Sequence, residues 1–208
     1  MKQILCFGDS NTWGLSPQTK TRYQSDIRWS GILDANLKEK QVKVIEEGLC
    51  GRTAVFEDEL RMGRNGSKIL PVLLESHAPL DVIILMLGTN DCKRFYNASA
   101  PVIGKGIALL LDQIRQYAKD SHVLLVSPIH LGDEVYRDEY DPEFSPESVK
   151  VSRQLKDVYQ KLAGERNIRF LAASDYAAPS PFDQEHLDEA GHASLAGAIS
   201  EAIADWVA

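Results

Sequence analysis

A serine directly after an apolar run is the residue of this chain best placed to act as a nucleophile. Residues 3–7 are mostly apolar and predict a first β-strand, and Gly8–Asn11 follows them with Ser10 at its third position. A serine at the end of a strand, where a helix begins, has its hydroxyl at the edge of the sheet. It also lies in the positive field of the helix N-terminus, which favours developing negative charge. Taken alone, Ser10 could equally be a helix N-cap.

A histidine near the end of the sequence is the candidate base for this serine. His186 follows Asp183 by three residues, so the carboxylate can bond the imidazole, fix its tautomer and stabilise the imidazolium. The same two residues could also form a surface pair at a helix start. His192, four residues after Asp188, is the rival base. We prefer His186 because it precedes or starts the helix and can lean over the strand ends, whereas we expect His192 to pack or to be solvated.

Donors for an oxyanion follow two further predicted strands. The amide of Asn90 carries N–H groups and no titratable charge, which suits it to a tetrahedral oxyanion. Gly51 can supply a backbone N–H to the same oxygen because glycine lets the backbone approach closely. The backbone N–H of Ser10 would be a third donor, although Gly51 and Gly88 could each be simple turn glycines. A hydroxyl, a base, a group that orients the base and oxyanion donors are what acyl transfer requires.

Short apolar runs separated by longer stretches with helical spacing must position these residues. The apolar runs are residues 2–8, 42–47, 80–87, 122–127 and 167–171, and the helical stretches are residues 27–38, 102–118, 146–164 and 188–207. Strands that alternate with helices predict an α/β fold with a parallel sheet covered on both faces. Ligands bind beyond the carboxyl ends of the strands in such folds, which is where the candidate residues fall.

Two long connections are expected to cover this edge of the sheet. Residues 128–146 are long for a connection, and long loops are often functional covers. They could equally form a solvated acidic loop or an oligomer contact. Residues 12–26 form the second cover, and we expect Asn11, Trp13 and Leu15 to contact the substrate. A confined apolar pocket with such walls would favour an alcohol over water as the acyl acceptor.

Composition and charge exclude several classes of partner. The chain has 208 residues, enough for a single domain over residues 1–208, and a formal net charge of −7. An acidic balance argues against nucleic acid or an anionic membrane as the main partner. Apolar runs are too short for a transmembrane helix. The first strand starts too close to Met1 for a signal peptide, so we expect a cytoplasmic protein.

Two other functions compete with acyl transfer. A metal-dependent phosphoesterase would use Asp9 and the segment Gly88–Asp91, but such enzymes need several clustered His and Asp ligands. No histidine lies near Asp9 in the sequence. Asp9 and Asp91 are expected instead to bond backbone N–H groups of neighbouring turns, and no metal site is expected. A non-catalytic ligand-binding module is the other alternative, since a fold does not fix a function.

Four segments together resemble the sequence blocks of the SGNH hydrolase superfamily, also called the GDSL esterase/lipase family. In chain order they are Gly8–Asn11, Glu47–Thr53, Gly88–Asp91 and Asp183–Leu187. By this resemblance, the name-giving residues would be Ser10, Gly51, Asn90 and His186, with Asp183 completing a triad. Asn11 departs from the pattern, because the family motif has leucine there.

Longer strings around these blocks, such as residues 4–10 and 86–91, resemble a narrower bacterial group of arylesterases and acyltransferases. The resemblance implies a three-layer α/β/α, flavodoxin-like fold with a five-stranded parallel sheet in the order 2-1-3-4-5. It implies a serine esterase acting on small aryl, short alkyl or acetyl esters, with acyl transfer to alcohols as a second outcome. It also implies no cofactor, a small-molecule ester as partner, and a homo-oligomer. The strand order would bring Ser10, Gly51 and Asn90 to the topological switch point.

Overall fold

A parallel five-stranded sheet forms the centre of the computed structural model, which describes residues 1–208. Its strands are β1 (Lys2–Gly8), β2 (Val42–Gly48), β3 (Val82–Met86), β4 (His122–Ser127) and β5 (Arg169–Ala172). They lie in the order β2-β1-β3-β4-β5, and every neighbouring pair is parallel. The expected α/β fold and strand order are therefore confirmed.

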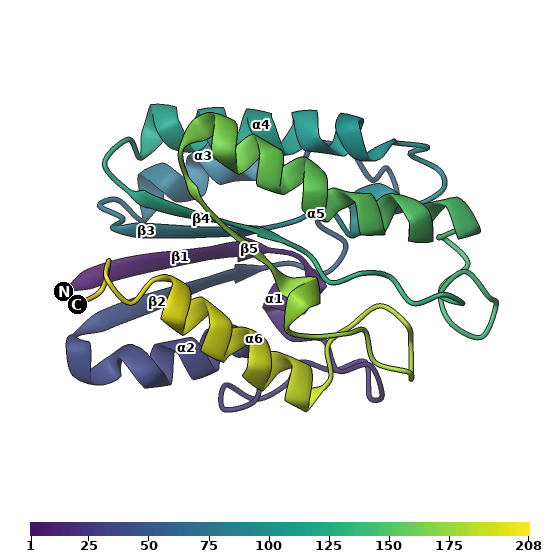
Figure 1. Ribbon diagram of the computed structural model, residues 1–208, viewed down its shortest axis with the longest axis horizontal. Coiled ribbons are helices and arrows are strands. Elements are labelled where there is room, and N and C mark those ends of the chain that lie inside the picture. Colours follow the sequence, from purple (N-terminus) through teal and green to yellow (C-terminus); the bar gives the residue numbers. More distant parts are fainter.

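Helices cover both faces of the sheet and complete three layers (Figure 1). On one face lie α3 (Gly66–Ser76), α4 (Ala100–Tyr117) and α5 (Pro146–Arg166), and on the other α2 (Trp29–Leu37) and α6 (Glu189–Ala202). Short elements complete the chain: α1 (Ser10–Trp13) and the 3₁₀ turns η1 (Lys38–Lys40), η2 (Asn90–Cys92) and η3 (Ala173–Asp175). The helix α1 lies at the carboxyl ends of the strands. Ser10, its first residue, therefore lies at the edge of the sheet where the sequence analysis expected it.

The inner strands are buried on both faces, and the alternation of their side chains divides the core in two. Successive side chains of a strand point to opposite faces. In β1, Leu5 and Phe7 join the cluster that includes α3, α4 and α5, whereas Ile4 and Cys6 join the cluster that includes α2 and α6. Apolar residues at nearly every position are what a parallel strand covered by helices requires, which explains the continuous apolar runs of β1 and β3. The edge strand β2 departs from this pattern, because it has Lys43 exposed and Glu46 and Glu47 half-buried.

The helix α3 is not indicated by the sequence patterns. Pro71 lies inside it, and proline is normally disfavoured in a helix interior because it lacks an N–H. The helix forms because Asn65 caps it, accepting a hydrogen bond from the Ser67 N–H at 3.0 Å, and because Leu70 and Leu74 are fully buried. Tertiary burial thus outweighs local propensity here.

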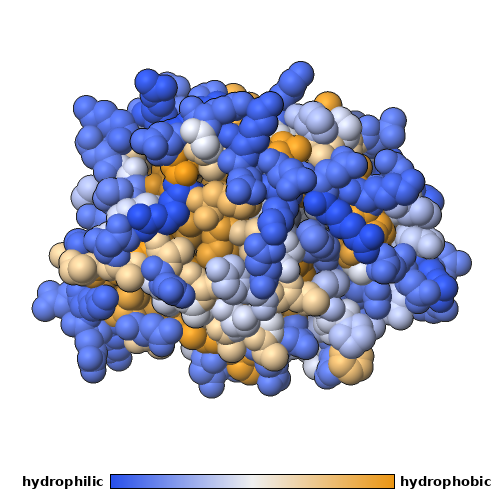
Figure 2. Space-filling view, viewed as in Figure 1, coloured by the Kyte–Doolittle hydropathy of each residue, from blue (hydrophilic) through white to orange (hydrophobic).

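The edge strand β5 faces a groove between α5 and α6. In Figure 2, which has the same view as Figure 1, apolar side chains lie in the middle of the visible surface and are surrounded by hydrophilic ones. The groove is lined by Phe170, Leu171 and Ala198, with Lys156 and Arg169 among its charged residues, and by no candidate site residue.

No helix of the structure is both long and apolar enough to cross a membrane.

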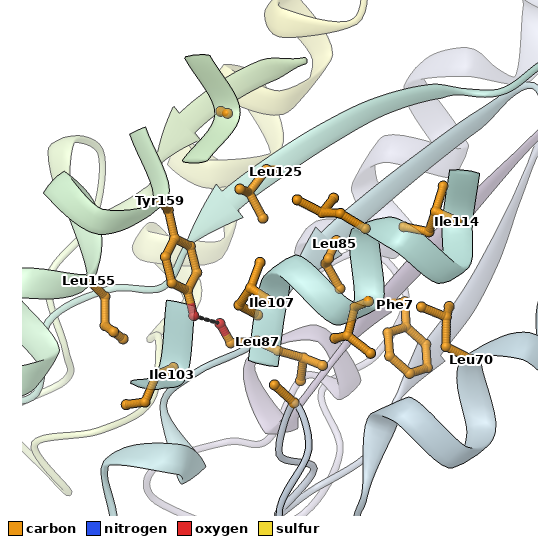
Figure 3. Close-up of a cluster of buried hydrophobic side chains, with 14 of the residues drawn as sticks. Phe7, Leu70, Leu85, Leu87, Ile103, Ile107, Ile114, Leu125, Leu155 and Tyr159 are labelled. Atoms are coloured by element: carbon orange, nitrogen blue, oxygen red, sulfur yellow. Dashed lines mark hydrogen bonds between the residues drawn. The ribbon is translucent and has the colours of Figure 1, made fainter. Parts of the chain in front are cut away.

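Tyr159 joins the core to the segment that carries Asn90. Its hydroxyl donates a hydrogen bond to the Leu87 carbonyl at 2.9 Å within the buried cluster of Figure 3. We expect Tyr159→Phe to lower the free energy of unfolding by about 1–3 kcal/mol, because the buried carbonyl loses its donor. Urea unfolding measures this change, with Tyr176→Phe at an exposed tyrosine as the control. An unchanged midpoint for Tyr159→Phe would contradict the expectation.

Candidate active site

Ser10, His186 and Asp183 are joined by a continuous chain of hydrogen bonds. The Ser10 Oγ lies 2.8 Å from His186 Nε2, and His186 Nδ1 lies 2.7 Å from Asp183 Oδ2. All three residues are buried, although 176 positions separate Ser10 from His186 in the sequence. The structure thus brings together the hydroxyl, the imidazole and the carboxylate that the sequence analysis selected.

The turn between β1 and α1 sets the place of Ser10. Asp9 caps the helix, its Oδ1 accepting a hydrogen bond from the Asn11 N–H at 3.0 Å. Gly8 permits the tight turn, because a Cβ there would lie 2.0 Å from Thr12 Oγ1. Ser10 is the first residue of α1, and the first N–H groups of a helix have no acceptor within it. The backbone N–H of Ser10 is therefore available beside its own hydroxyl.

Two side chains fix the segment that carries His186. The Asp183 Oδ1 accepts hydrogen bonds from the backbone N–H groups of Glu185 at 3.1 Å and of His186 at 3.0 Å. The Asn11 amide accepts from the Leu187 N–H at 2.9 Å and donates to the Glu185 carbonyl at 3.4 Å. The expected substrate contact of Asn11 is thus corrected, because its amide is occupied in holding the histidine segment against α1.

Gly51 and Asn90, the candidate oxyanion donors, lie at the same edge as Ser10. The Asn90 Nδ2 donates one hydrogen bond to the Arg52 carbonyl at 3.1 Å, and its second N–H remains free to bond a ligand. Gly51 has φ +82°, where side chains are strained, and a Cβ there would lie 2.6 Å from Arg61 Nη1. Its N–H makes no backbone hydrogen bond. Both residues line one pocket with Ser10.

Arg52 is a residue to which the sequence analysis gave no role. Its guanidinium donates hydrogen bonds to the carbonyls of Gly8, at 2.9 Å, and Glu47. It also lies 4.3 Å from the centre of the Phe7 ring. Burial lowers the pKa of Arg52 to about 10. It ties the ends of β1 and β2 together. The sequence signals for Arg52 were its place after a predicted strand and its membership of the segment Glu47–Thr53, which resembles a family block.

Charges around His186 favour its protonated form. Burial lowers the pKa of His186, but the carboxylates of Glu185, Asp183 and Asp9 outweigh burial and raise it above its ordinary value. Burial raises the pKa of Asp183, yet hydrogen bonds from His186 and Lys20 hold it well below its ordinary value. The Lys20 Nζ lies 2.8 Å from Asp183 Oδ2. Asp183 therefore stays ionised and can stabilise an imidazolium.

A pocket of about 320 Å³ opens over Ser10, and its walls are mostly charged or polar. Besides the residues already named, it is lined by Leu15, Cys50, Arg61, Lys93, Asp141, Glu143 and Glu185. The connection 128–146 contributes Asp141 and Glu143, so the part of it nearest the site is acidic. The expectation of an apolar pocket is corrected, because the loops bring charged side chains to the edge of the sheet.

Of the two residues predicted to form pocket walls, Leu15 lies in the pocket, as expected, and Trp13 packs outside it. The Trp13 ring lies under the Arg22 guanidinium at 5.5 Å, and its backbone packs against Gly48 so closely that a Cβ there would meet it. Trp13 closes the last turn of α1 and packs outside the pocket, which corrects its predicted substrate contact.

His192, the alternative base, and Asp91, a residue of the alternative metal site, are both engaged in contacts within the fold. His192 is fully buried, accepts a hydrogen bond from the Trp29 N–H at 3.2 Å and packs edge-on against Tyr23. Both carboxylate oxygens of Asp91 lie 3.0 Å from the Ala54 N–H. The expected packing of His192 and the backbone bonding of Asp91 are confirmed. No group of three or more His, Cys, Asp or Glu side chains is arranged to hold a metal ion.

Removing the Asn90 amide tests whether it stabilises charge in the transition state. We expect Asn90→Ala to lower kcat by about 10²–10³-fold, the usual effect of losing one oxyanion donor, with little change in KM. Steady-state hydrolysis of p-nitrophenyl acetate measures both constants. Asn36→Ala, at an exposed position of α2, is the control. A loss of less than fivefold for Asn90→Ala would show that the amide does not bond the oxyanion.

If His186 is the base, the pH dependence of kcat/KM is expected to report its protonation state. A base must be neutral to accept a proton, so activity falls on the acid side, with a midpoint above about 6.5 because the pKa of His186 is raised. Lys20→Met removes a positive charge next to Asp183. Asp183 would then stabilise the imidazolium more strongly and move the midpoint to higher pH. A pH profile of wild type and Lys20→Met measures both midpoints. A Lys20→Met midpoint at lower pH than that of wild type would contradict the expectation.

This geometry is suited to attack on a carbonyl group. The imidazole can take the proton of the Ser10 hydroxyl, Asp183 can stabilise the resulting cation, and the donors at Gly51 and Asn90 face the same pocket. Such a set of groups supports two-step acyl transfer.

Comparisons with known proteins agree with this chemistry. The model of the GDSL-like Lipase/Acylhydrolase family matches residues 6–198. Among solved structures, the native aryl esterase of M. smegmatis is 32% identical, with a TM-score of 0.91 over 99% of this chain and 100% of that chain. A carbohydrate acetylesterase from Sinorhizobium meliloti is 33% identical, with a TM-score of 0.90 over 99% of each chain. No curated protein sequence matches. The chain is a carboxylic ester hydrolase and belongs to the GDSL-like lipase/acylhydrolase, or SGNH hydrolase, family.

Proposed function

We propose that this hydrolase cleaves short-chain esters, above all acetyl esters, of polar alcohols, with Ser10 as nucleophile, His186 as base and Asp183 as the group that orients it. The observation that carries the proposal is the hydrogen-bond chain from Ser10 through His186 to Asp183. It opens into a small pocket with charged walls.

The proposed reaction has two steps. The Ser10 Oγ attacks the ester carbonyl carbon while its proton passes to His186 Nε2, and the resulting oxyanion is held by the N–H groups of Ser10, Gly51 and the Asn90 amide. His186 then returns the proton to the leaving alkoxide, which departs as an alcohol and leaves an acyl-Ser10. Water then attacks the acyl carbon and gives its proton to His186, which returns it to the Ser10 Oγ as the acyl–Ser10 bond breaks, so that the carboxylic acid is released and the free enzyme is restored.

The pocket walls support a short acyl group. Burying one CH₂ in an apolar environment gains about 0.8 kcal/mol, but Leu15 and Cys50 are the only apolar lining residues. A longer acyl chain would therefore meet charged side chains and gain little. The names of the similar structures, an aryl esterase and a carbohydrate acetylesterase, support esters with a small acyl group.

The same walls support hydrolysis over acyl transfer. An alcohol competes with water for the acyl-enzyme when the site is apolar and excludes water. The carboxylates of Asp141, Glu143 and Glu185 line this pocket, and charged groups retain water strongly. We propose that water is the main acceptor.

A chain-length series tests the substrate class. We expect kcat/KM to be highest for p-nitrophenyl acetate and to fall for the butyrate and octanoate esters. Addition of a small alcohol such as ethanol should divert only a minor part of the acyl group, measured as ethyl acetate formed. A preference for octanoate, or transfer that exceeds hydrolysis in dilute ethanol, would refute the respective part of the proposal.

A further inference from the structure

Glu185 is a buried carboxylate inside the pocket for which the reaction above has no use. Its side chain is 9% exposed and its Oε1 lies 3.7 Å from His186 Nε2, beyond hydrogen-bond distance. It lines the same pocket as Ser10 and His186. No backbone or side-chain group of the chain donates a hydrogen bond to this carboxylate, whereas Asp183, two residues earlier, accepts four.

The fold does not require a carboxylate at this position. The backbone of Glu185 is held by its neighbours, its N–H donating to Asp183 Oδ1 and its carbonyl accepting from Asn11 Nδ2. An apolar side chain could occupy the same backbone. The Glu185 carboxylate reaches the pocket, where it lies without a protein donor and with only part of its hydration. A ligand that carries a donor would restore a hydrogen bond that the protein itself does not supply.

The place of Glu185 relative to His186 indicates which part of a substrate it meets. His186 Nε2 must approach the leaving oxygen to protonate it, and Glu185 Oε1 is 3.7 Å from that same nitrogen. Groups attached next to the leaving oxygen therefore lie within reach of Glu185. The carbonyl oxygen lies instead toward the donors at Gly51 and Asn90. In a vicinal diol, the two oxygens are about one hydrogen-bond length apart, so a neighbouring hydroxyl fits this position.

We propose that Glu185 determines specificity for the alcohol part of the ester by accepting a hydrogen bond from a hydroxyl next to the ester oxygen. The substrate class is then a monoacylated polyol or sugar that keeps a free neighbouring hydroxyl. This inference rests on the proposed function, in which short acyl esters of polar alcohols are hydrolysed. A site that bonds a substrate hydroxyl discriminates strongly against analogues lacking it.

A second role for Glu185 must be separated from this one. Burial raises the pKa of Glu185, with Asp141 and Asp183 adding to the rise and His186 and Lys93 opposing it. When ionised, Glu185 would stabilise the protonated His186 through space. That effect changes the hydrolysis of every ester by the same factor, because it acts on the histidine. Recognition of a hydroxyl changes only the esters that carry one.

Two esters that differ only at the neighbouring hydroxyl, which is free in one and methylated in the other, test this recognition. Ethylene glycol monoacetate carries the free hydroxyl, and 2-methoxyethyl acetate has it methylated. Acid release is followed in a pH-stat, and the readout is the ratio of kcat/KM for the two esters, in which any common effect on His186 cancels. The proteins are wild type, Glu185→Leu, Glu185→Gln and the control Glu189→Gln, which changes an exposed glutamate at the start of α6.

We expect the wild-type ratio to favour the hydroxyl ester and to fall by about 10–100-fold in Glu185→Leu, as the loss of a hydrogen bond to a charged acceptor implies. Glu185→Gln should give an intermediate ratio and Glu189→Gln the wild-type ratio. Thermal melts should show Glu185→Leu at least as stable as wild type. A ratio that is the same in wild type and both Glu185 variants overturns this inference alone. A wild type inactive on both acetates overturns the proposed substrate class as well.

Discussion

Replacing Ser10 by alanine is expected to lower kcat by about 10⁶-fold, as for removal of the nucleophile from a serine hydrolase triad. The Ser10 Oγ is the only hydroxyl bonded to His186 Nε2, so the variant loses the nucleophile of the proposed mechanism. The double variant Ser10→Ala/His186→Ala should be no slower than Ser10→Ala, because the two residues act as one unit and their effects do not add.

Turnover of p-nitrophenyl acetate and labelling by a fluorophosphonate measure this loss. The wild type should take up one phosphonyl group on the peptide containing Ser10, found by mass spectrometry, and Ser10→Ala none. Ser127→Ala is the matched control, because Ser127 is a buried serine at the end of the strand β4 and does not line the pocket. A Ser10→Ala variant that keeps a tenth of wild-type activity would remove Ser10 from the mechanism.

The inner strands could be predicted because helices cover them on both faces and they are therefore almost continuously apolar, as in β3, where every residue is buried. Residues 122–127 predicted β4 with its observed bounds, His122–Ser127. Helices held mainly by tertiary contacts were harder to predict. The helix α3 contains Pro71, and its stability comes from the burial of Leu70 and Leu74, which no local pattern reveals.

The candidate site was predictable where residue type and chain position together restrict the chemistry. Ser10 and His186 each follow a strand in the sequence, and parallel strands end at one edge. The direction of a side chain was not predictable in this way. Asn11 and Trp13 share the short turn of α1 with Ser10, but their side chains bond or pack elsewhere. The charge of the pocket escaped prediction because its walls come from separate loops, such as the one that carries Lys93.

Asp183→Asn is expected to lower kcat by about 10⁴-fold while the geometry of the site is kept. The Oδ1 of an asparagine would still accept the backbone N–H groups of Glu185 and His186. Its amide nitrogen would replace Oδ2, which now accepts from His186 Nδ1 and Lys20 Nζ. The amide N–H groups of the new asparagine would then face two other donors, His186 Nδ1–H and the Lys20 ammonium. The imidazole would have to place its proton on Nε2, and in that tautomer it cannot take the proton of Ser10.

Steady-state kinetics and proton NMR together test this expectation. KM should change little because Asp183 does not line the pocket, and the far-downfield proton of the bond between His186 and Asp183 should disappear. The control is Asp188→Asn, because Asp188 caps α6 by accepting from the Gly191 N–H and asparagine is an equally good cap. If Asp183→Asn retained kcat within tenfold of wild type, the carboxylate would be a support of the loop, and His186 would act as a base without it.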